Sequence, residues 1–169
     1  GTTDIAVISM NKIVASKCLR TGGDEMNDAL IRYLRRTYNL SVGERSAQDA
    51  KNAIGSVLSD DPAECTVKGI CTLEGLPKSV KLTQADLKEA LQEPCVQIVS
   101  AVNQVLESTP PELLSDIQEN GILLSGGGAN LKGLDTLIAR ATGYEISVAP
   151  EPQLCVAKGT ERYWQLLAQ

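Results

Sequence analysis

The sequence has 169 residues, a formal net charge of −5 and 43% hydrophobic residues, which is ordinary for a globular protein with a sizeable core. With no basic stripe to neutralise phosphates, the charge argues against nucleic acid as a partner. The absence of histidine excludes His-based catalytic dyads and most mixed zinc sites, and five cysteines without a CxxC pair favour reduced thiols.

The first half of the chain predicts a hairpin, two helices and two further strands. The predicted strands cover residues 5–10, 12–19, 64–68 and 79–82, and the helices begin after Gly22-Gly23-Asp24 and at Ser46, the second running to about Leu58. We expect Asn11-Lys12 to form the hairpin turn, because asparagine tolerates the backbone angle that a tight turn needs. Asp60-Asp61-Pro62 is predicted to end the second helix.

The second half alternates helices and short strands. Helices are predicted at 84–91, 96–106, 112–118 and 154–167, and strands at 122–124 and 144–148. Thr83 is the expected N-cap of the first of these helices. Pro94 interrupts the pattern, so we expect a kink or a junction between two helical segments there. Thr109-Pro110-Pro111 is predicted to stop the second segment.

A glycine run organises this half. The apolar residues 122–124 suit a buried strand, Gly126, Gly127 and Gly128 follow, and a helical pattern from Leu131 comes at once. A strand that ends in glycines and opens a helix can bring backbone N–H groups against a phosphate or nucleotide. A lone glycine run between a strand and a helix is also explained by a tight turn.

Several sequence blocks occur in the order found in one family. They include GTTDIAVIS, RYLRRTYNLSVGER, GLPKSV, QIVSAVNQVLESTPPEL, GILLSGGGANLKGLD and CVAKGT. Over essentially its whole length the chain resembles the MreB/Mbl family, bacterial actin homologues that support rod shape. The resemblance implies an α/β fold: half of an actin-like, ribonuclease H-like ATPase fold, with a mixed sheet, flanking helices and a smaller α+β insertion.

The resemblance also implies a division of the chain. Residues 1–21 and 97–169 would form an inner subdomain (IIA-like), and residues 22–96 an inserted outer subdomain (IIB-like). In this family GTTD completes a phosphate loop whose leading residues would lie before Gly1. We therefore expect the chain to be the second large domain of a longer protein whose N-terminal half precedes it.

Candidate ligand contacts follow from the same resemblance, with ATP or ADP and Mg as the implied cofactors. The matching positions are Gly1, Thr2 and Thr3 in the phosphate loop, Gly22, Gly23 and Asp24 at a helix start, Glu44 and Lys51 beside the adenosine, and Gly126, Gly127 and Gly128 in the closing loop. Asp4 resembles the acidic residue that closes the phosphate motif. An ordinary helix start explains Gly22-Gly23-Asp24 nearly as well, and an exposed helix lysine is usually only solvated.

Two departures from the family concern the nucleotide. Relatives usually carry an acidic residue where this chain has Gln48, and another where it has Ala53. The loss of a carboxylate that holds the ribose would weaken a charge-assisted hydrogen bond, so a lower nucleotide affinity is expected. Relatives hydrolyse ATP slowly, but the groups for hydrolysis belong mainly to the other half. We assign no catalytic residue and no metal ligand here and expect this chain alone to be inactive.

The family implies self-association into filaments, the cell-shape regulator RodZ as a partner of the inner subdomain, and the inner face of the cytoplasmic membrane as the location, reached through the other half. ATP would clamp the two large domains and favour head-to-tail assembly. The alternative is a non-filamentous actin-fold scaffold or binding domain with weakened nucleotide contacts. A third hypothesis, a chaperone-like or sugar-kinase-like ATPase of the same superfamily, is opposed by the GLPKSV and STPPEL blocks.

Overall fold

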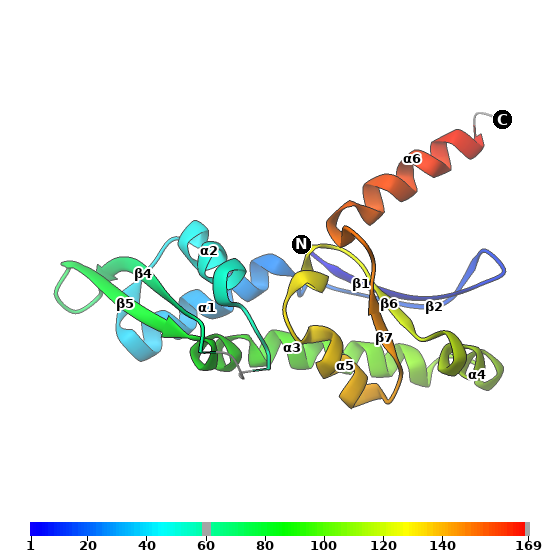
Figure 1. Ribbon diagram of the computed structural model, residues 1–169, viewed down its shortest axis with the longest axis horizontal. Helices are drawn as coiled ribbons and strands as arrows, with labels where there is room; N and C mark the ends of the chain where they lie inside the picture. The colour runs from blue at the N-terminus through cyan, green and yellow to red at the C-terminus, as the bar shows by residue number, and fades with distance from the viewer. Residues whose placement is uncertain (59–61, 168–169) are drawn as a thin grey trace.

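One long helix runs along the molecule beneath two packed regions (Figure 1). In the computed structural model, which describes residues 1–58 and 62–167, this helix is α3 (Gln84–Glu107). The elements formed by the middle of the chain lie over one end of it, and the elements formed by the two ends of the chain lie over the other. The expected stop at Asp60-Asp61-Pro62 falls largely outside the described residues.

The chain begins with an antiparallel hairpin of β1 (Thr3–Ser9) and β2 (Lys12–Leu19). Met10 and Asn11 form its turn, with φ of 49° and 60°. A two-residue turn with positive φ at both positions matches the twist of the strands it joins. The expectation that asparagine supplies the unusual angle is confirmed, but the turn lies one residue earlier than predicted, and Lys12 already belongs to β2.

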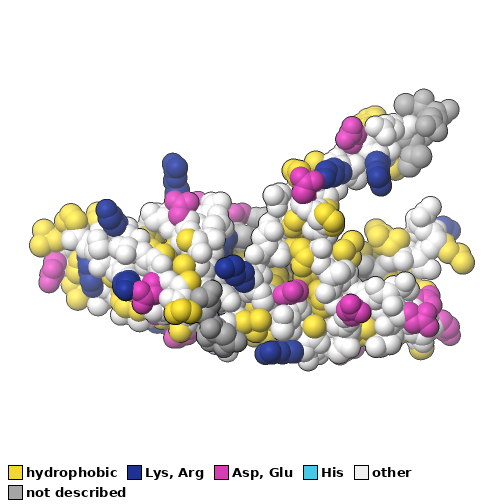
Figure 2. All heavy atoms as spheres, viewed as in Figure 1, with side chains coloured by type: hydrophobic (Ala, Val, Ile, Leu, Met, Phe, Trp, Pro, Cys, Tyr) yellow, Lys and Arg dark blue, Asp and Glu magenta, His cyan; other side chains and the backbone are white. Residues whose placement is uncertain are grey.

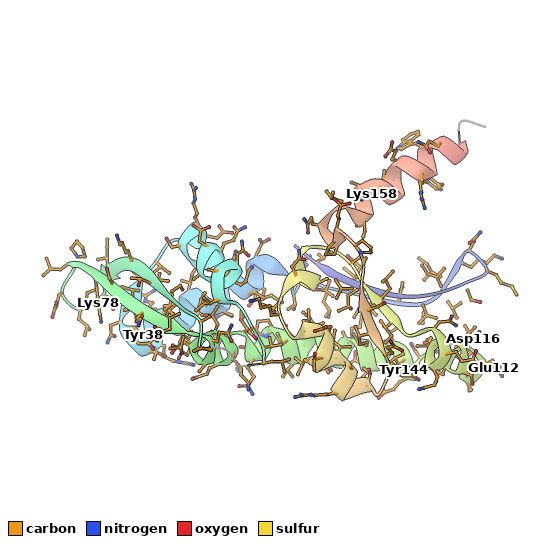
Figure 3. The ribbon with its side chains drawn as sticks, viewed as in Figure 1. Tyr38, Lys78, Glu112, Asp116, Tyr144 and Lys158 are labelled. Carbon is orange, nitrogen blue, oxygen red and sulfur yellow. The ribbon has the colours of Figure 1, made fainter. Side chains whose placement is uncertain are left out.

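The middle of the chain packs α1 (Gly23–Tyr38) and α2 (Glu44–Ile54) against a three-stranded sheet. The sheet has the order β3 (Leu40–Ser41), β4 (Glu64–Cys71), β5 (Pro77–Thr83), and both pairs are antiparallel. At the far end of this region Lys78 donates to the carbonyl of Tyr38 at 2.6 Å (Figure 3). The first core is almost wholly aliphatic: Leu30, Tyr33, Leu34, Leu40, Ala47, Ala50, Ile54, Val67, Val80, Leu82, Leu87 and Ala90.

α2 is shorter than predicted, because it ends at Ile54 and not near Leu58. The N–H of Gly55 donates to the carbonyl of Lys51 at 2.8 Å, and Gly55 itself leaves the helix in an extended conformation. Val57, predicted on the apolar stripe of this helix, is buried instead in the second core. The two-residue strand β3 was not predicted, since it is too short to show an alternating pattern.

α3 is a single helix of 24 residues with Pro94 inside it, so the predicted junction between two helical segments is wrong, and the alternative of a kink stays a prediction. Its start is as expected: Thr83 is the N-cap, and Asp86 completes a capping box with it. Proline removes one N–H from the ladder, but Pro94 is fully buried and its neighbours Leu91 and Cys95 are buried too. Tertiary packing on both sides of Pro94 therefore outweighs the lost hydrogen bond.

The end of the chain builds the second region with α4 (Pro111–Asn120), β6 (Ile122–Leu124), α5 (Leu134–Thr142) and β7 (Ile146–Val148). β6 and β7 pair in parallel, so this region combines parallel and antiparallel pairing in two two-stranded sheets. Tyr144 lies outside β7, contrary to the predicted bounds. The second core consists of Met26, Val57, Leu91, Cys95, Ile98, Val102, Leu134 and Ile138.

The last helix, α6 (Cys155–Leu167), points away from the rest of the molecule (Figure 1). A 3-10 turn at Pro152–Leu154 precedes it, so it begins one residue later than predicted. Val156, Tyr163 and Trp164 are exposed along it.

Figure 2 shows acidic side chains gathered over α4 at one end of the molecule. Within the described residues, no helix has both the length and the apolar character needed to cross a membrane.

Candidate functional site

The start of β1 meets the start of α1. The hydroxyl of Thr3 donates to the carbonyl of Thr21 at 2.6 Å, which ties the first strand to the residue before the Gly22-Gly23 pair. A Cβ on Gly22 would lie 2.8 Å from the carbonyl carbon of Gly1 and 3.1 Å from the amide nitrogen of Thr2. Only glycine leaves room for the two backbones to approach this closely. The contacts place Gly1–Thr3 directly beside the N-terminus of α1.

Acidic side chains flank this junction. Asp24 lies in the first turn of α1. The hydroxyl of Thr2 donates to Asp4 at 2.9 Å. Hydrogen bonds from Cys18 and from Thr2 lower the pKa of the Asp4 carboxyl, so Asp4 stays ionised at neutral pH. The predicted phosphate loop is therefore ordered by its own side-chain contacts.

Lys51 reaches this junction from α2. Its ammonium donates to the carbonyl oxygen of Gly23 at 2.9 Å, which joins the last turn of α2 to the first residue of α1. Burial lowers the pKa of Lys51, and the nearby charge of Asp24 partly opposes that shift. Lys51 is thus a half-buried cation at the start of a helix, and not a solvated surface lysine.

Three further α2 positions named in the sequence analysis are exposed. Glu44 is the first residue of the helix, seven residues before Lys51, so the two side chains share one face about two turns apart. Gln48 lies between them on that face, and Ala53 is exposed as well. Glu44, Gln48 and Lys51 therefore form one stripe, in which the middle position is neutral.

The glycine loop has a different local structure from the one predicted. Gly127–Asn130 forms a 3-10 turn, and α5 begins only at Leu134, so an α-helix does not follow the glycines at once. Gly126 has a φ of +82°, and its N–H donates to the carbonyl of Pro152 at 2.8 Å. A Cβ on Gly126, Gly127 or Gly128 would meet no heavy atom within 4 Å. The loop is consequently held at Gly126 by this hydrogen bond, and its glycines face open space.

The structure thus brings Gly1–Thr3, Gly22–Asp24 and Lys51 into contact with one another. Glu44 lies on the same helix as Lys51. The glycine loop is linked to this cluster through the backbone: Ser56, just after α2, forms a parallel bridge with Lys132, just after the loop. Among the described residues, no group of three His, Cys, Asp or Glu side chains is placed to hold a metal ion.

Comparison with known proteins decides the family. The MreB/Mbl protein family matches residues 1–169. The chain belongs to the MreB/Mbl family.

Curated relatives of this MreB/Mbl chain are cell shape-determining proteins. It is 47% identical over 160 residues to MreB of Escherichia coli K12, which covers 94% of this chain and 46% of the relative. It is 43% identical over 161 residues to Mbl of Bacillus subtilis 168, covering 95% of this chain and 48% of the relative. The chain therefore spans about half the length of these relatives.

Solved structures share the fold. Crystal structures of MreB5 of Spiroplasma citri bound to ADP and to AMPPNP each match with a TM-score of 0.95 and 32% identity over 99% of this chain and 51% of theirs. The MamK double helical filament matches with a TM-score of 0.71 at 20% identity, which shows the fold alone. The predicted actin-like α/β fold is confirmed.

The contacts that connect the parts of this candidate site were missed in the sequence analysis. The bridge between Ser56 and Lys132 is a single isolated pair, so it leaves no alternating pattern in the sequence. Thr21 was also missed, although it is buried, accepts from Thr3 and donates to Gln97 at 2.7 Å. Its position directly before the Gly22-Gly23 pair was the one available signal.

Proposed function

We propose that this chain is the second large domain of an actin-like protein that binds ATP or ADP and forms filaments that maintain rod shape and organise cell-wall synthesis. Membership of the MreB/Mbl family supports the proposal, as do the S. citri MreB5 structures with ADP and AMPPNP. Because the chain spans about half of its relatives, the complete activity requires the other half. We propose an inner subdomain of residues 1–21 and 97–169 and an outer one of 22–96. The first hydrophobic core supports this division because all of its buried residues lie within 22–96, whereas the second core joins residues of both parts, such as Leu91 and Ile98.

The observation that carries the nucleotide proposal is the open space in front of Gly127 and Gly128. Small residues facing open space let a phosphate or a base approach the backbone closely. Gly22 lets the backbone of Gly1 and Thr2 lie against the start of α1, where Lys51 provides a cation. These residues fit a nucleotide that lies between the glycine loop and the start of α1.

In this proposal each part of the chain has a separate task. Thr2 and Thr3 would hold the terminal phosphates with backbone N–H groups and hydroxyls, and Glu44 and Lys51 would border the adenosine. Bound Mg would neutralise part of the phosphate charge. We place its ligands and the water-positioning groups for hydrolysis mainly in the other half, so this chain alone would hold half of a site and hydrolyse nothing.

Thermal melting in increasing Mg-ATP tests this proposal. A ligand that binds only the folded state raises the melting temperature as its concentration exceeds the dissociation constant. We expect a shift for the complete protein and none for the 169-residue chain. Gly127→Val should abolish the shift without unfolding the protein, because the new side chain enters open space at a position without positive φ. Gly159→Val, a matched change on exposed α6, should leave the shift intact.

Absence of a shift in the complete protein would favour the alternative function, a non-filamentous scaffold of the same fold. The neutral, exposed side chains of Gln48 and Ala53 on α2 favour that alternative. Sedimentation of the complete protein with and without ATP separates the two functions. ATP-dependent pelleting supports the filament, whereas nucleotide binding without pelleting, or neither, supports the scaffold.

We further propose that the complete protein lies in the cytoplasm at the inner face of the plasma membrane and that RodZ binds the inner subdomain. The family resemblance supports both statements. Titration of the cytoplasmic part of RodZ against the 169-residue chain tests the second, and saturable binding is expected. Flotation of the complete protein with anionic vesicles tests the first; this chain alone should not float, because the membrane contact is assigned to the other half.

A further inference from the structure

Two backbone segments meet beside the glycine loop. Ser56 forms a parallel bridge with Lys132, and the N–H of Val57 donates to the carbonyl of Lys132 at 3.0 Å. We call this contact, between residues 55–58 and residues 131–133, the bridge contact. Ser56 and Val57 are buried, at 5% and 7% exposure. The segment that leaves α2 is thus held against the segment that leaves the glycine loop.

The bridge contact is tightly fitted on both sides. A Cβ on Gly55 would lie 3.2 Å from Cδ1 of Leu131, and a Cβ on Gly133 would lie 2.5 Å from Cγ of Leu58. Gly133 also has a φ of +82°, which glycine adopts without strain. Leu58 therefore occupies the space that any side chain at position 133 would need.

Hydrogen bonds continue from the bridge contact to both parts of the candidate site. On one side, Gly55 donates to the carbonyl of Lys51, whose ammonium is bound to Gly23. On the other side, the N–H of Leu131 donates to the carbonyl of Gly128 at 3.1 Å. Lys51 and the glycine loop are thus connected through one short path, which is buried on the side of residues 55–57.

We propose that the bridge contact positions Lys51 and the glycine loop relative to each other for nucleotide binding. Leu58 and Gly133 are then positioning residues: they act through the path and touch no ligand themselves. This inference rests on the proposed nucleotide site and adds the residues that align its two parts. Because this contact is closely packed, a displacement of one backbone segment must displace the other segment as well.

The test uses ATP titrations of the complete protein with matched glycine variants. Gly133→Ala introduces both backbone strain and a clash with Leu58. Gly143→Ala introduces similar strain at the other end of α5, where φ is +79° and a Cβ would meet nothing within 4 Å. The difference in Kd for ATP between the two variants therefore reports the effect of the contact with Leu58, separate from that of backbone strain. Adding Leu58→Ala to the Gly133→Ala variant removes the clash. The Kd for ATP of this double variant then measures the coupling between positions 58 and 133.

We expect Gly133→Ala to raise the Kd for ATP about fivefold or more relative to Gly143→Ala, and the added Leu58→Ala to recover most of that loss. In hydrogen exchange, ATP should slow the Val57 amide in the unsubstituted protein but not in Gly133→Ala. A role in stability alone would lower the melting temperature and leave both readouts unchanged.

Equal Kd values for Gly133→Ala and Gly143→Ala would overturn the positioning role while leaving the proposed nucleotide site intact. Failure of the unsubstituted protein to bind ATP would overturn the proposed function and this inference with it. If Gly133→Ala does not fold, Leu58→Ala alone replaces it, with Leu123→Ala, at the exposed middle position of β6, as its control. Weaker ATP binding only in Leu58→Ala supports the role, and equal binding overturns it.

Discussion

The ammonium of Lys51 and the carbonyl of Gly23 are joined by a hydrogen bond of 2.9 Å. The bond crosses from the last turn of α2 to the first turn of α1. A cation at the N-terminus of a helix is electrostatically unfavourable, because the helix dipole places positive charge there. The carbonyl of Gly23 and the carboxylate of Asp24 offset this cost, and a bound phosphate would offset it further.

Replacement of Lys51 by methionine should therefore affect ligand binding more than folding. We expect Lys51→Met to raise the Kd for ATP in the complete protein about tenfold, the size of one lost charge-assisted hydrogen bond. Arg45→Met, on the exposed face of the same helix, is the control and should leave the Kd unchanged. Isothermal titration measures both, and equal affinities would remove Lys51 from the site.

Asp86, in the first turn of α3, is the centre of a polar network. Its carboxylate completes the capping box with Thr83 and accepts the hydroxyls of Tyr33 at 2.8 Å and Tyr38 at 2.7 Å. Asp86→Ala should lower the free energy of unfolding by about 2 kcal/mol, because it removes a helix cap and leaves two hydroxyls unpaired. Asp116→Ala on exposed α4 should change it by less than about 0.5 kcal/mol. Urea denaturation compares the stability of the Asp86→Ala and Asp116→Ala variants, and similar midpoints for the two would contradict the prediction.

The same carboxyl predicts a dependence of stability on acid. Burial alone would raise the pKa of Asp86, but hydrogen bonds from Thr83, Tyr38 and Tyr33 outweigh burial and lower it. The folded state then binds fewer protons than the unfolded state, in which the pKa is about 3.9. The stabilisation is present above that value and is lost as pH falls through the folded-state pKa.

Asp86→Asn should consequently show a smaller loss of stability between pH 6 and pH 3 than the unsubstituted chain. Asp116→Asn is the control and should retain the full loss. Urea melts at each pH give the difference. A loss of the same size in Asp86→Asn would show that other carboxyls cause the acid sensitivity.

Gly69 is required where β4 passes β3. A Cβ there would lie 2.2 Å from the carbonyl oxygen of Ser41 and 2.9 Å from Cγ1 of Val42. Gly69→Ala should destabilise the protein by about 1–3 kcal/mol, since the strands must separate to admit the methyl group. Gly43→Ala, where a Cβ would meet nothing within 4 Å, should be tolerated. Urea midpoints report the difference, and equal midpoints would contradict the crowding.

Elements with a strong periodic pattern were predicted well from the sequence. The helix from Gly23 and the hairpin strands show clear apolar periodicity, and the structure confirms them with shifts of one or two residues. The junction predicted at Pro94 was wrong because a local rule about proline competes with packing that only the folded chain reveals. The end of α2 was predicted too late because Val57 was assigned to the apolar stripe of that helix. In the structure Val57 packs into the second core instead.

The candidate site residues were chosen by residue type and family resemblance and not by geometry, and their role in ligand binding stays a prediction. Glycines that face open space leave a visible run, so the loop at Gly126–Gly128 was found, although its 3-10 turn was not. The family resemblance, and not periodicity, pointed to Lys51. Its bond to a backbone carbonyl depends on how α1 and α2 pack, which no single-residue signal encodes.

The unbroken α3 has a consequence for how the molecule unfolds. A helix of 24 residues is about 36 Å long, and α3 contributes to both cores: its first two turns give Leu87 and Ala90 to the first core, and the following turns give Leu91, Cys95, Ile98 and Val102 to the second. Loss of either core would leave part of α3 without tertiary contacts and would expose the apolar side chains that this part buries. The two regions are therefore expected to melt as one cooperative unit, with a single calorimetric transition, although each has its own hydrophobic centre.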